Sequence, residues 1–388
     1  MKTDKLKITA VSSTRADYGI MRPLLLRLEK AEWCELKVVA TGTHLLEKYG
    51  NTINEIERDN LSIDKVSIIE NDSTADIMAN TVKRFDEYFN NHEIDVVLLL
   101  GDRYEIFEVA SACVINNLPI IHIAGGETTE GAIDEVFRHS ITKMSYLHLA
   151  STEVYKNRII QLGEDPERVF NTGAMGVENV LNVKCLSKEE LSKELDFDLD
   201  KEYAVVTFHP VTMEQGSELS QLNELLKVIE NHPEINFIIT KSNVDKGGSL
   251  INDKWDEFGK IHDNVKVFAS LGMLRYFSAI KYCSYVIGNS SSGIVEVPSF
   301  KVPTINIGDR QMGRIQSTSI INCKPVSENI ERALEYAKSE EYKNVLAKSH
   351  NPYERECPSR DMLEIIKDTF YGKRINLKKS FYDLEFEE

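Results

Sequence analysis

The chain has 388 residues, of which 42% are hydrophobic and 28% are charged, and its formal net charge is -16. This length suits two hydrophobic cores, and the composition excludes a disordered chain. The acidic balance argues against duplex nucleic acid as a partner, which would favour a basic face. It leaves room for an anionic small ligand, because a cleft in an acidic protein can be locally positive.

The sequence shows no segment that would place the protein in a membrane or outside the cell. No apolar stretch approaches the roughly 20 residues that span a bilayer. The charged residues 1–7 lead straight into a strand-like run, unlike a signal peptide. The six cysteines are scattered and form neither a CxxC pair nor a cysteine–histidine cluster. We therefore expect a cytoplasmic protein with reduced thiols, no metal site and no membrane partner.

Short apolar, β-branched runs alternate with amphipathic stretches through the first half of the chain. In chain order the predicted strands are residues 7–13, 36–42, 95–101, 119–125 and 146–151. Helices are predicted between them, for example at residues 21–30 and 76–90. This alternation predicts βαβ units, and hence a parallel sheet that helices cover on both faces.

A second series of the same kind follows. Its predicted strands are residues 203–209, 236–241, 265–268, 285–288 and 304–308, with helices such as 218–231 and 273–281. The polar stretch 183–201 separates the two series. It contains the sequence SKEE at 187–190, which is typical of a capping box at a helix start.

The sequence therefore predicts an α/β protein with two Rossmann-like, doubly wound domains. We expect an N-terminal domain at 1–182, a C-terminal domain at 200–373 and a loosely ordered charged tail at 374–388. If the strand ends of the two domains face each other, they leave one central cleft. In such sheets ligands bind beyond the carboxyl ends of the strands, so functional residues should follow the predicted strands.

Two segments of the first half end on chemically useful residues. Residues 12–19 (SSTRADYG) place hydroxyls and Arg15 where a helix should begin, which suits a phosphate, although an ordinary N-capped turn fits equally. Asp102 and Arg103 follow the most apolar strand. Asp102 is a candidate general acid or base, or else an N-cap that pairs with Arg103.

The segment 122–135 (HIAGGETTEGAIDE) carries four carboxylates on a loop that follows a strand. Its adjacent glycines let the backbone approach a ligand closely. We single out Glu127 and Asp134 as candidate catalytic acids. The alternatives are a solvated helix face for Glu130 or Glu135, a core position for His122 and a simple i,i+4 pair between Asp134 and Arg138.

The second half places three further segments at strand ends. His209 could donate to a phosphate or move protons, or it is a turn histidine before a proline. Ser290, Ser291 and Ser292 open a helix and suit a diphosphate, whereas Glu296 could accept from two ribose hydroxyls; an ordinary helix cap is the alternative. Arg310 could reach phosphate or base, or lie in a surface turn.

Together these segments resemble the hydrolysing UDP-N-acetylglucosamine 2-epimerases of sialic acid and related nonulosonic acid biosynthesis. The matching segments run across nearly the whole chain, at residues 14–18, 41–44, 101–103, 125–127, 138–143, 208–212, 288–293 and 308–311. The resemblance implies a fold of the glycosyltransferase-B type, with UDP held mainly by the second domain. It implies no cofactor, a UDP-sugar as substrate, and a homodimer or homotetramer.

The implied reaction converts UDP-N-acetylglucosamine to N-acetylmannosamine and UDP. The C2 proton and UDP are lost to give a glycal, and water then adds to release the 2-epimeric sugar. Carried over by resemblance, Asp102 and Asp134 match acid–base positions, and His209 matches a residue implicated in catalysis. The resemblance also implies contacts to the substrate from Arg15, His44, Arg103, Ser290, Ser291, Ser292, Glu296 and Arg310.

One position departs from the sialic acid branch of this family, which carries a catalytic glutamate where this chain has Ala124. Either Glu127 takes part of that role, or the substrate differs. The run from Thr129 to Glu135 is closer to the legionaminic acid branch, whose substrate is UDP-N,N'-diacetylbacillosamine. The rival functions are a non-hydrolysing 2-epimerase, a glycosyltransferase of the same fold, and an inactive sensor of nucleotide sugars.

Overall fold

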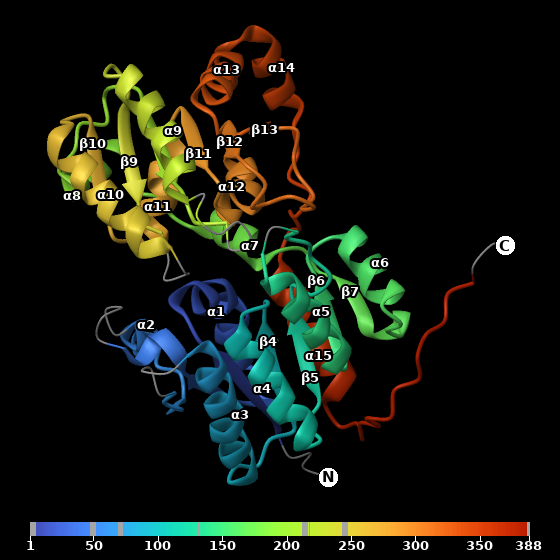
Figure 1. Cartoon of the computed structure of the whole chain (residues 1–388). Coiled ribbons are helices and arrows are strands. Elements are labelled where there is room, and N and C mark those ends of the chain that lie inside the picture. Colours follow the sequence, from blue (N-terminus) through green and yellow to red (C-terminus); the bar gives the residue numbers. More distant parts are fainter. Residues whose placement is uncertain are drawn as a thin grey trace. The chain divides into compact units, whose positions relative to one another are not determined.

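The computed structural model describes residues 5–46, 52–68, 73–130, 132–211, 216, 218–242 and 247–385 (Figure 1). The chain divides into two compact units. Unit 1 comprises Met1–Glu127, Asp134–Glu178 and Arg355–Glu388, whereas unit 2 comprises Thr128–Ile133 and Asn179–Glu354. Each unit is built around one parallel sheet, so the predicted α/β class with two doubly wound domains is confirmed.

Unit 1 holds a seven-stranded sheet. Its strands are β1 (Leu6–Ser12), β2 (Cys34–Ala40), β3 (Ile63–Lys65), β4 (Val96–Leu100), β5 (Ile120–Ile123), β6 (Leu147–Ala150) and β7 (Val169–Asn171). Its helices are α1 (Arg15–Lys30), α2 (Ile53–Arg58), α3 (Thr74–Asn90), α4 (Tyr104–Ile115), α5 (Asp134–Met144), α6 (Glu153–Gln161) and α15 (Pro358–Phe370), with 3₁₀ turns at η1 (Gly42–Leu45) and η3 (Pro166–Arg168). Helix α7 (Met175–Asn182) carries the chain into unit 2.

Unit 2 holds a six-stranded sheet. Its strands are β8 (Tyr203–Thr207), β9 (Asn236–Thr240), β10 (Val265–Phe268), β11 (Tyr285–Gly288), β12 (Thr304–Ile307) and β13 (Ile320–Cys323). Its helices are α8 (Lys188–Leu195), α9 (Glu218–Asn231), α10 (Gly248–Ile261), α11 (Gly272–Tyr282), α12 (Ser291–Val295), α13 (Ser327–Lys338) and α14 (Glu340–Lys348), with a 3₁₀ turn at η4 (Val297–Phe300).

The two sheets share the same strand order, which the first sheet extends by one strand, β7. The strand order is β3-β2-β1-β4-β5-β6-β7 in unit 1 and β10-β9-β8-β11-β12-β13 in unit 2. The order therefore reverses between β1 and β4 in the first sheet and between β8 and β11 in the second. Ligands of doubly wound sheets bind beyond the carboxyl ends of the strands at such a reversal, because the flanking crossovers diverge there and leave a crevice.

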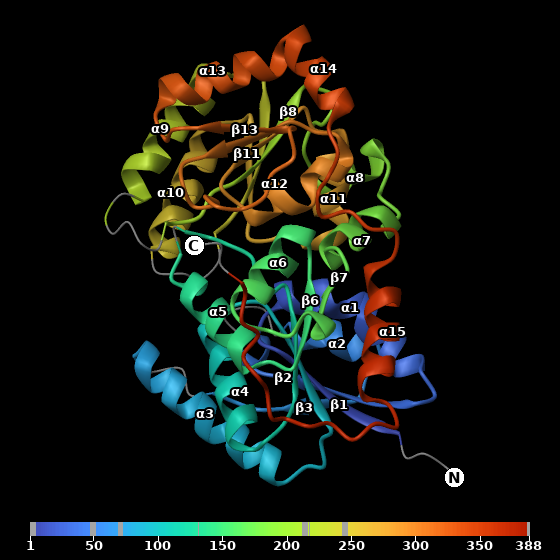
Figure 2. The same ribbon diagram turned by 90° about the vertical axis from the view of Figure 1, so that its right-hand side faces the viewer.

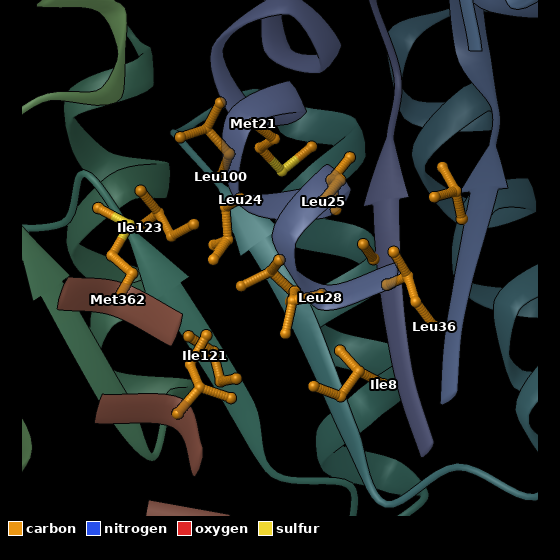
Figure 3. Close-up of a cluster of buried hydrophobic side chains, with 14 of the residues drawn as sticks. Ile8, Met21, Leu24, Leu25, Leu28, Leu36, Leu100, Ile121, Ile123 and Met362 are labelled. Carbon is orange, nitrogen blue, oxygen red and sulfur yellow. The ribbon is translucent and has the colours of Figure 1, made fainter. Parts of the chain in front are cut away.

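The two faces of the first sheet bury different helices. Figure 3 shows the face on which Met21, Leu24, Leu25 and Leu28 of α1 lie over strand residues that include Ile8 and Leu100. The opposite face packs against α3, α4 and α5, for example through Phe85 of α3. Strand β4 (VVLLL) is buried along its whole length, which explains its continuous apolar run.

Three strands were not predicted from the sequence. Strands β3, β7 and β13 lie at sheet edges, and each is only three or four residues long. Edge strands are half solvated and short, so their sequences lack the apolar run that marks a central strand. The helix start predicted at 187–190 is confirmed, because Ser187 and Glu190 form a reciprocal capping box on α8.

The end of the chain differs from the expected domain 200–373, because α15 packs beside α1 in unit 1 (Figure 2). Met362, Ile366 and Phe370 of α15 are buried in the same core as the α1 leucines. The start of α15 is also fixed from unit 1, since Glu178 accepts hydrogen bonds from the backbone N–H of Ser359 (2.7 Å) and its hydroxyl (2.6 Å).

The tail was expected to be loosely ordered, yet residues 374–385 make specific contacts with unit 1. The Lys379 ammonium donates to the carbonyls of Lys143 (3.0 Å) and Ser145 (2.7 Å) and pairs with buried Glu164 at 2.5 Å. Although burial raises it, hydrogen bonds from His148, Lys143 and Lys379 lower the pKa of Glu164 to about 2. The pairing of Lys379 with buried Glu164 therefore orders a segment that has no regular secondary structure.

Replacing Lys379 by methionine should loosen this tail. The loss of hydrogen bonds to a buried charged group makes local opening easier by about 2 kcal/mol. The amide of Tyr382, which donates to the carbonyl of Gly163 at 3.0 Å, should then exchange its hydrogen faster. Hydrogen exchange measures this directly. Lys378→Met, at an exposed neighbouring position, is the control, and equal exchange in both variants would contradict the role of Lys379.

Within the described residues, no helix combines the length and apolar character that a membrane span requires. All six cysteines lie in the described part of the chain and are free thiols. Burial raises the pKa of Cys34, Cys283 and Cys323 to about 12 in each case. These three thiols are therefore protonated near neutral pH and poor nucleophiles.

Candidate active site

The first strand of unit 1 ends in a closed turn. Thr14 and Asp17 form a reciprocal capping box on α1, and the Asp17 carboxylate accepts from the backbone N–H groups of Ser13 (2.8 Å) and Thr14 (2.7 Å). These donors and the positive end of the helix dipole already face a carboxylate. The N–H groups of Ser13 and Thr14 therefore bind Asp17, and the role of Arg15 as a substrate contact stays a prediction.

His44 lies behind that turn and has no exposed surface. Its Nε2 is 2.9 Å from Oγ of Ser12, and its Nδ1 is 2.9 Å from Oγ1 of Thr52. Burial lowers the pKa of His44, against the opposing charge of Asp17, and so favours the neutral ring. Both ring nitrogens of His44 therefore have partners next to the turn, and its substrate contact stays a prediction that the resemblance implies.

The two predicted arginines of unit 1 both face acidic neighbours. Arg15 is half-exposed, and its guanidinium lies 3.9 Å from the carboxylate of Glu55. Arg103 caps the start of α4 through its backbone and makes two hydrogen bonds of 3.2 Å to Glu105. Arg103 is therefore held beside the end of β4.

Asp102, the first candidate acid, lies directly after β4 at the reversal point of the sheet. Its carboxylate accepts a hydrogen bond from Arg138, whose side chain is 1% exposed, while the Asp102 side chain is 25% exposed. Gly101 precedes it with a φ of +82°, a conformation that glycine adopts freely. The turn thus presents a partly accessible carboxylate that a buried cation fixes from behind.

Glu127 and Asp134 bracket the loop that follows β5. Glu127 is buried and accepts from the hydroxyl of Ser151 at 2.8 Å, while its backbone carbonyl accepts from Arg138 at 3.1 Å. Asp134 is the first residue of α5 and is partly exposed. Gly126 permits this path, since a Cβ there would lie 2.4 Å from the carbonyl oxygen of Tyr155.

His122 is a buried core residue, as one of the two readings of the sequence proposed. One ring nitrogen lies 2.8 Å from the carbonyl of Gly101, so the histidine supports the turn that carries Asp102. Burial lowers the pKa of His122 to about 3, although the bond with Gly101 opposes this. Ala124 follows with a φ of +63°, unusual for a residue other than glycine.

In unit 2 the corresponding reversal point joins β8 to β11. The backbone N–H of His209 donates to Oδ1 of Asn289 at 2.7 Å, and Nδ2 of Asn289 donates back to the carbonyl of His209 at 2.8 Å. The ring Nδ1 of His209 lies 3.0 Å from the hydroxyl of Ser242. His209 is partly exposed, with its backbone and one ring nitrogen fixed.

The serine segment after β11 builds a short helical turn. Ser290 caps α12, which is only five residues long, and accepts from the N–H of Ser292 at 3.4 Å. Ser291 is exposed, whereas Ser290, Ser292 and Glu296 are partly exposed. The segment thus carries three serine hydroxyls, of which the Oγ of Ser292 is buried, and the carboxylate of Glu296.

Arg310 and Gln311 converge on the same asparagine from the loop after β12. Arg310 donates to the backbone carbonyl of Asn289 at 3.1 Å, and Gln311 donates to that oxygen at 2.9 Å. Asn289 is 1% exposed and so ties the β8, β11 and β12 ends together. The predicted residues His209, Ser290 and Arg310 therefore belong to one cluster in unit 2.

The structure also identifies residues that sequence reasoning did not single out. Asn289 connects the strand ends of unit 2, and in unit 1 Arg138 contacts the carboxylates of Asp102 and Glu135 and the carbonyl of Glu127. The importance of these two residues could not be predicted from the sequence, because their hydrogen-bond partners are distant in the chain. Gly131 and Thr212, which belong to two of the quoted segments, lie outside the described residues.

The chain is similar to known proteins over most of its length. Residues 26–367 match the family model for UDP-N-acetylglucosamine 2-epimerase. The chain is 44% identical to polysialic acid biosynthesis protein P7 of Escherichia coli, over 97% of both chains. It is 40% identical to GDP/UDP-N,N'-diacetylbacillosamine 2-epimerase (hydrolyzing) of Campylobacter jejuni, over 87% of this chain and 89% of that protein.

Solved structures show the same fold. The UDP-GlcNAc 2-epimerase from Neisseria meningitidis, bound to UDP-GlcNAc, superposes with a TM-score of 0.80 at 19% identity, over 94% of this chain and 100% of that chain. A UDP-N-acetylglucosamine 2-epimerase described as putative, from Listeria monocytogenes, gives a TM-score of 0.79 at 19% identity, over 97% of this chain and 100% of that chain. The family model and the relatives at 44% and 40% identity confirm the resemblance seen in the motifs, and the chain belongs to the UDP-N-acetylglucosamine 2-epimerase family.

Proposed function

We propose that this protein is a hydrolysing UDP-sugar 2-epimerase that converts UDP-N-acetylglucosamine and water to N-acetylmannosamine and UDP. The observation that carries the proposal is the Asp102 carboxylate, which Arg138 fixes at the reversal point of the first sheet while part of its surface stays accessible. A weakly acidic C2 proton needs a base in a fixed position, and this carboxylate is one. The relative at 44% identity is named as a polysialic acid biosynthesis protein, and those at 40% and 35% identity are named as hydrolysing 2-epimerases.

The proposed first step is an elimination. A carboxylate of unit 1 takes the C2 proton, the C1–O bond to UDP breaks, and a C1–C2 double bond forms. UDP leaves with the electron pair of the broken bond. In the second step the oxygen of water bonds to C1. A proton is delivered to C2 on the face opposite to the one from which the first proton was removed. Asp102 and Asp134 are our candidates for the two proton transfers, with Glu127 as a further acid.

Unit 2 supplies the groups that stabilise the leaving UDP in this proposal. Hydroxyls and a guanidinium neutralise the charge that develops on a diphosphate, and each such donor strengthens as the bond breaks. Ser290, Ser291, Ser292 and Arg310 cluster after β11 and β12, and His209 lies beside them. We assign the ribose contact to Glu296. A solved neighbour described as a UDP co-structure, with a TM-score of 0.78, supports a nucleotide role for this fold.

A second substrate, UDP-N,N'-diacetylbacillosamine, is favoured by a specific observation. Two relatives, 40% and 35% identical, are named as 2-epimerases of this sugar, and both matches cover more than four fifths of this chain. Ala124 fits the same branch, because it stands where the sialic acid branch carries a glutamate. The reaction is the same on both substrates, and the product would belong to legionaminic acid biosynthesis.

The test is an NMR time course in D₂O with the two UDP-sugars offered separately. Free UDP together with a 2-epimeric sugar that carries deuterium at C2 would support the hydrolysing reaction, and the faster substrate would assign the branch. UDP-N-acetylmannosamine as product would indicate a non-hydrolysing epimerase instead. UDP binding without turnover would favour a glycosyltransferase or a sensor and would contradict the proposal.

We also propose that the protein acts in the cytoplasm as a homodimer or homotetramer. Nucleotide sugars and reduced thiols both belong to that compartment, and the family resemblance supports the assembly. Light scattering of the purified protein at several concentrations tests the assembly: a constant mass equal to one chain would contradict it.

A further inference from the structure

Arg138 is among the largest fully buried side chains of the protein, with 1% of its surface exposed. It lies on α5, four residues after Asp134. An arginine is rarely buried so completely unless its guanidinium is paired, since removing an unpaired charge from water costs several kcal/mol. Its position inside unit 1 therefore needs neighbours that offset this cost.

The neighbours come from three separate segments. One terminal nitrogen of Arg138 donates to the Asp102 carboxylate after β4. The other donates to the carbonyl of Glu127 at 3.1 Å and to the Glu135 carboxylate at 2.6 Å. The planar guanidinium holds these acceptors in one fixed fork, which a lysine ammonium cannot reproduce.

The contacts also reach the histidines around the site. Glu135 lies 3.0 Å from Nε2 of His139, and the hydroxyl of Thr142 donates to the carbonyl of Arg138 at 3.0 Å. That hydroxyl lies 3.4 Å from Nδ1 of His122, whose other nitrogen contacts Gly101. Arg138 is thus the buried centre of a partly exposed network beside the turn that carries Asp102.

We propose that Arg138 is a positioning residue of the epimerase, which fixes the Asp102 carboxylate and the Glu127 backbone in one geometry. The inference rests on the proposed function. Arg138 acts through Asp102 and makes no contact with substrate in this assignment.

Two substitutions test the proposal by UDP release. Arg138→Ala should lower kcat by roughly 100-fold, because a small displacement of a catalytic group costs about that much, while KM changes by less than about threefold. Millimolar guanidinium should restore part of the lost kcat by filling the vacated space. The Arg138→Lys variant keeps the positive charge but loses the two-pronged donor geometry of the guanidinium. It should therefore fold and still lose most of its kcat.

A double-mutant cycle separates positioning from general stability. In an Asp102→Asn background, Arg138→Lys should cause little further loss of kcat, because the group it positions is already gone. Equal factors in both backgrounds would overturn the proposal. Arg22→Met is the matched control: it breaks the arginine–aspartate pair of Arg22 with Asp59, at 2.5 Å in the same unit, and should leave kcat near that of the wild type.

If the proposed function fails, the result differs from the one expected when only the positioning role of Arg138 fails. If the wild type releases no UDP from either UDP-sugar, the epimerase assignment fails, and Arg138 is then judged by a crystal structure of Arg138→Lys. A displaced Asp102 carboxylate and Glu127 carbonyl would support the positioning role independently of activity. An unmoved pair would overturn it.

Discussion

Replacing Asp102 by asparagine should lower kcat by roughly 10²–10⁴-fold, the range that general acid–base groups contribute. The amide keeps the size of the carboxylate but cannot accept the C2 proton. The affinity for UDP should change little, because we assign the UDP contacts to unit 2. Steady-state kinetics on both UDP-sugars and calorimetric titration with UDP measure the two quantities.

Asp95→Asn is the matched control for this experiment. Asp95 directly precedes β4, whereas Asp102 lies just beyond its other end; Asp95 is exposed and accepts from the backbone N–H of Lys7 at 2.8 Å. It should retain wild-type kcat. Asp102→Asn also weakens the pairing of buried Arg138, so thermal unfolding must show that the variant is folded. A folded Asp102→Asn enzyme with the turnover of the wild type would remove Asp102 from the mechanism.

Replacing Gly288 by alanine should destabilise unit 2 by about 3 kcal/mol, from the combined cost of a strained backbone and a steric clash. Gly288 ends β11 with a φ of +137°, and a Cβ there would lie 1.9 Å from the carbonyl oxygen of Thr207. That oxygen accepts the backbone N–H of Asn289 at 3.1 Å, so the clash displaces the residue that organises the cluster. UDP affinity should therefore fall together with stability.

Gly272→Ala separates the two causes of this loss. Gly272 also has a positive φ, of +66°, but a Cβ there would meet no atom within 4 Å. Gly272→Ala should lower the free energy of unfolding by only about 1 kcal/mol, which is the cost of the backbone conformation. Urea unfolding followed by the fluorescence of Trp255, fully buried in unit 2, in a Trp33→Phe background, reports this unit alone. Equal midpoints for the two alanine variants would show that the close approach to Thr207 is tolerated.

Sequence patterns predicted several features of the site because the relevant signals are local. A strand such as β4 is apolar throughout, and the residue after it, Asp102, must lie at the carboxyl edge of a parallel sheet. The same reasoning placed His209 and Ser290 after β8 and β11. Their grouping around Asn289 could not be predicted, since the contact joins residues 80 positions apart.

At other positions the structure shows contacts, some local and some between distant segments, that the sequence alone did not indicate. The hydroxyl-rich turn at Thr14 has the composition of a phosphate site, yet Asp17 engages its backbone N–H groups. His44 belongs to a motif shared with the family, yet burial and two hydrogen bonds place it beneath that turn. Composition reports which groups are available, whereas only the fold shows which of them already have partners.

The sequence by itself determined the α/β class, the two sheets, their central strands and the family. These depend on the period of apolar residues and on motifs read along the chain. Only the tertiary structure decided that α15 packs in unit 1, that Lys379 is anchored on Glu164, and that Arg138 holds Asp102. Each of these pairs lies far apart in the sequence, and burial of a charge or an apolar face selects its partner by position in space.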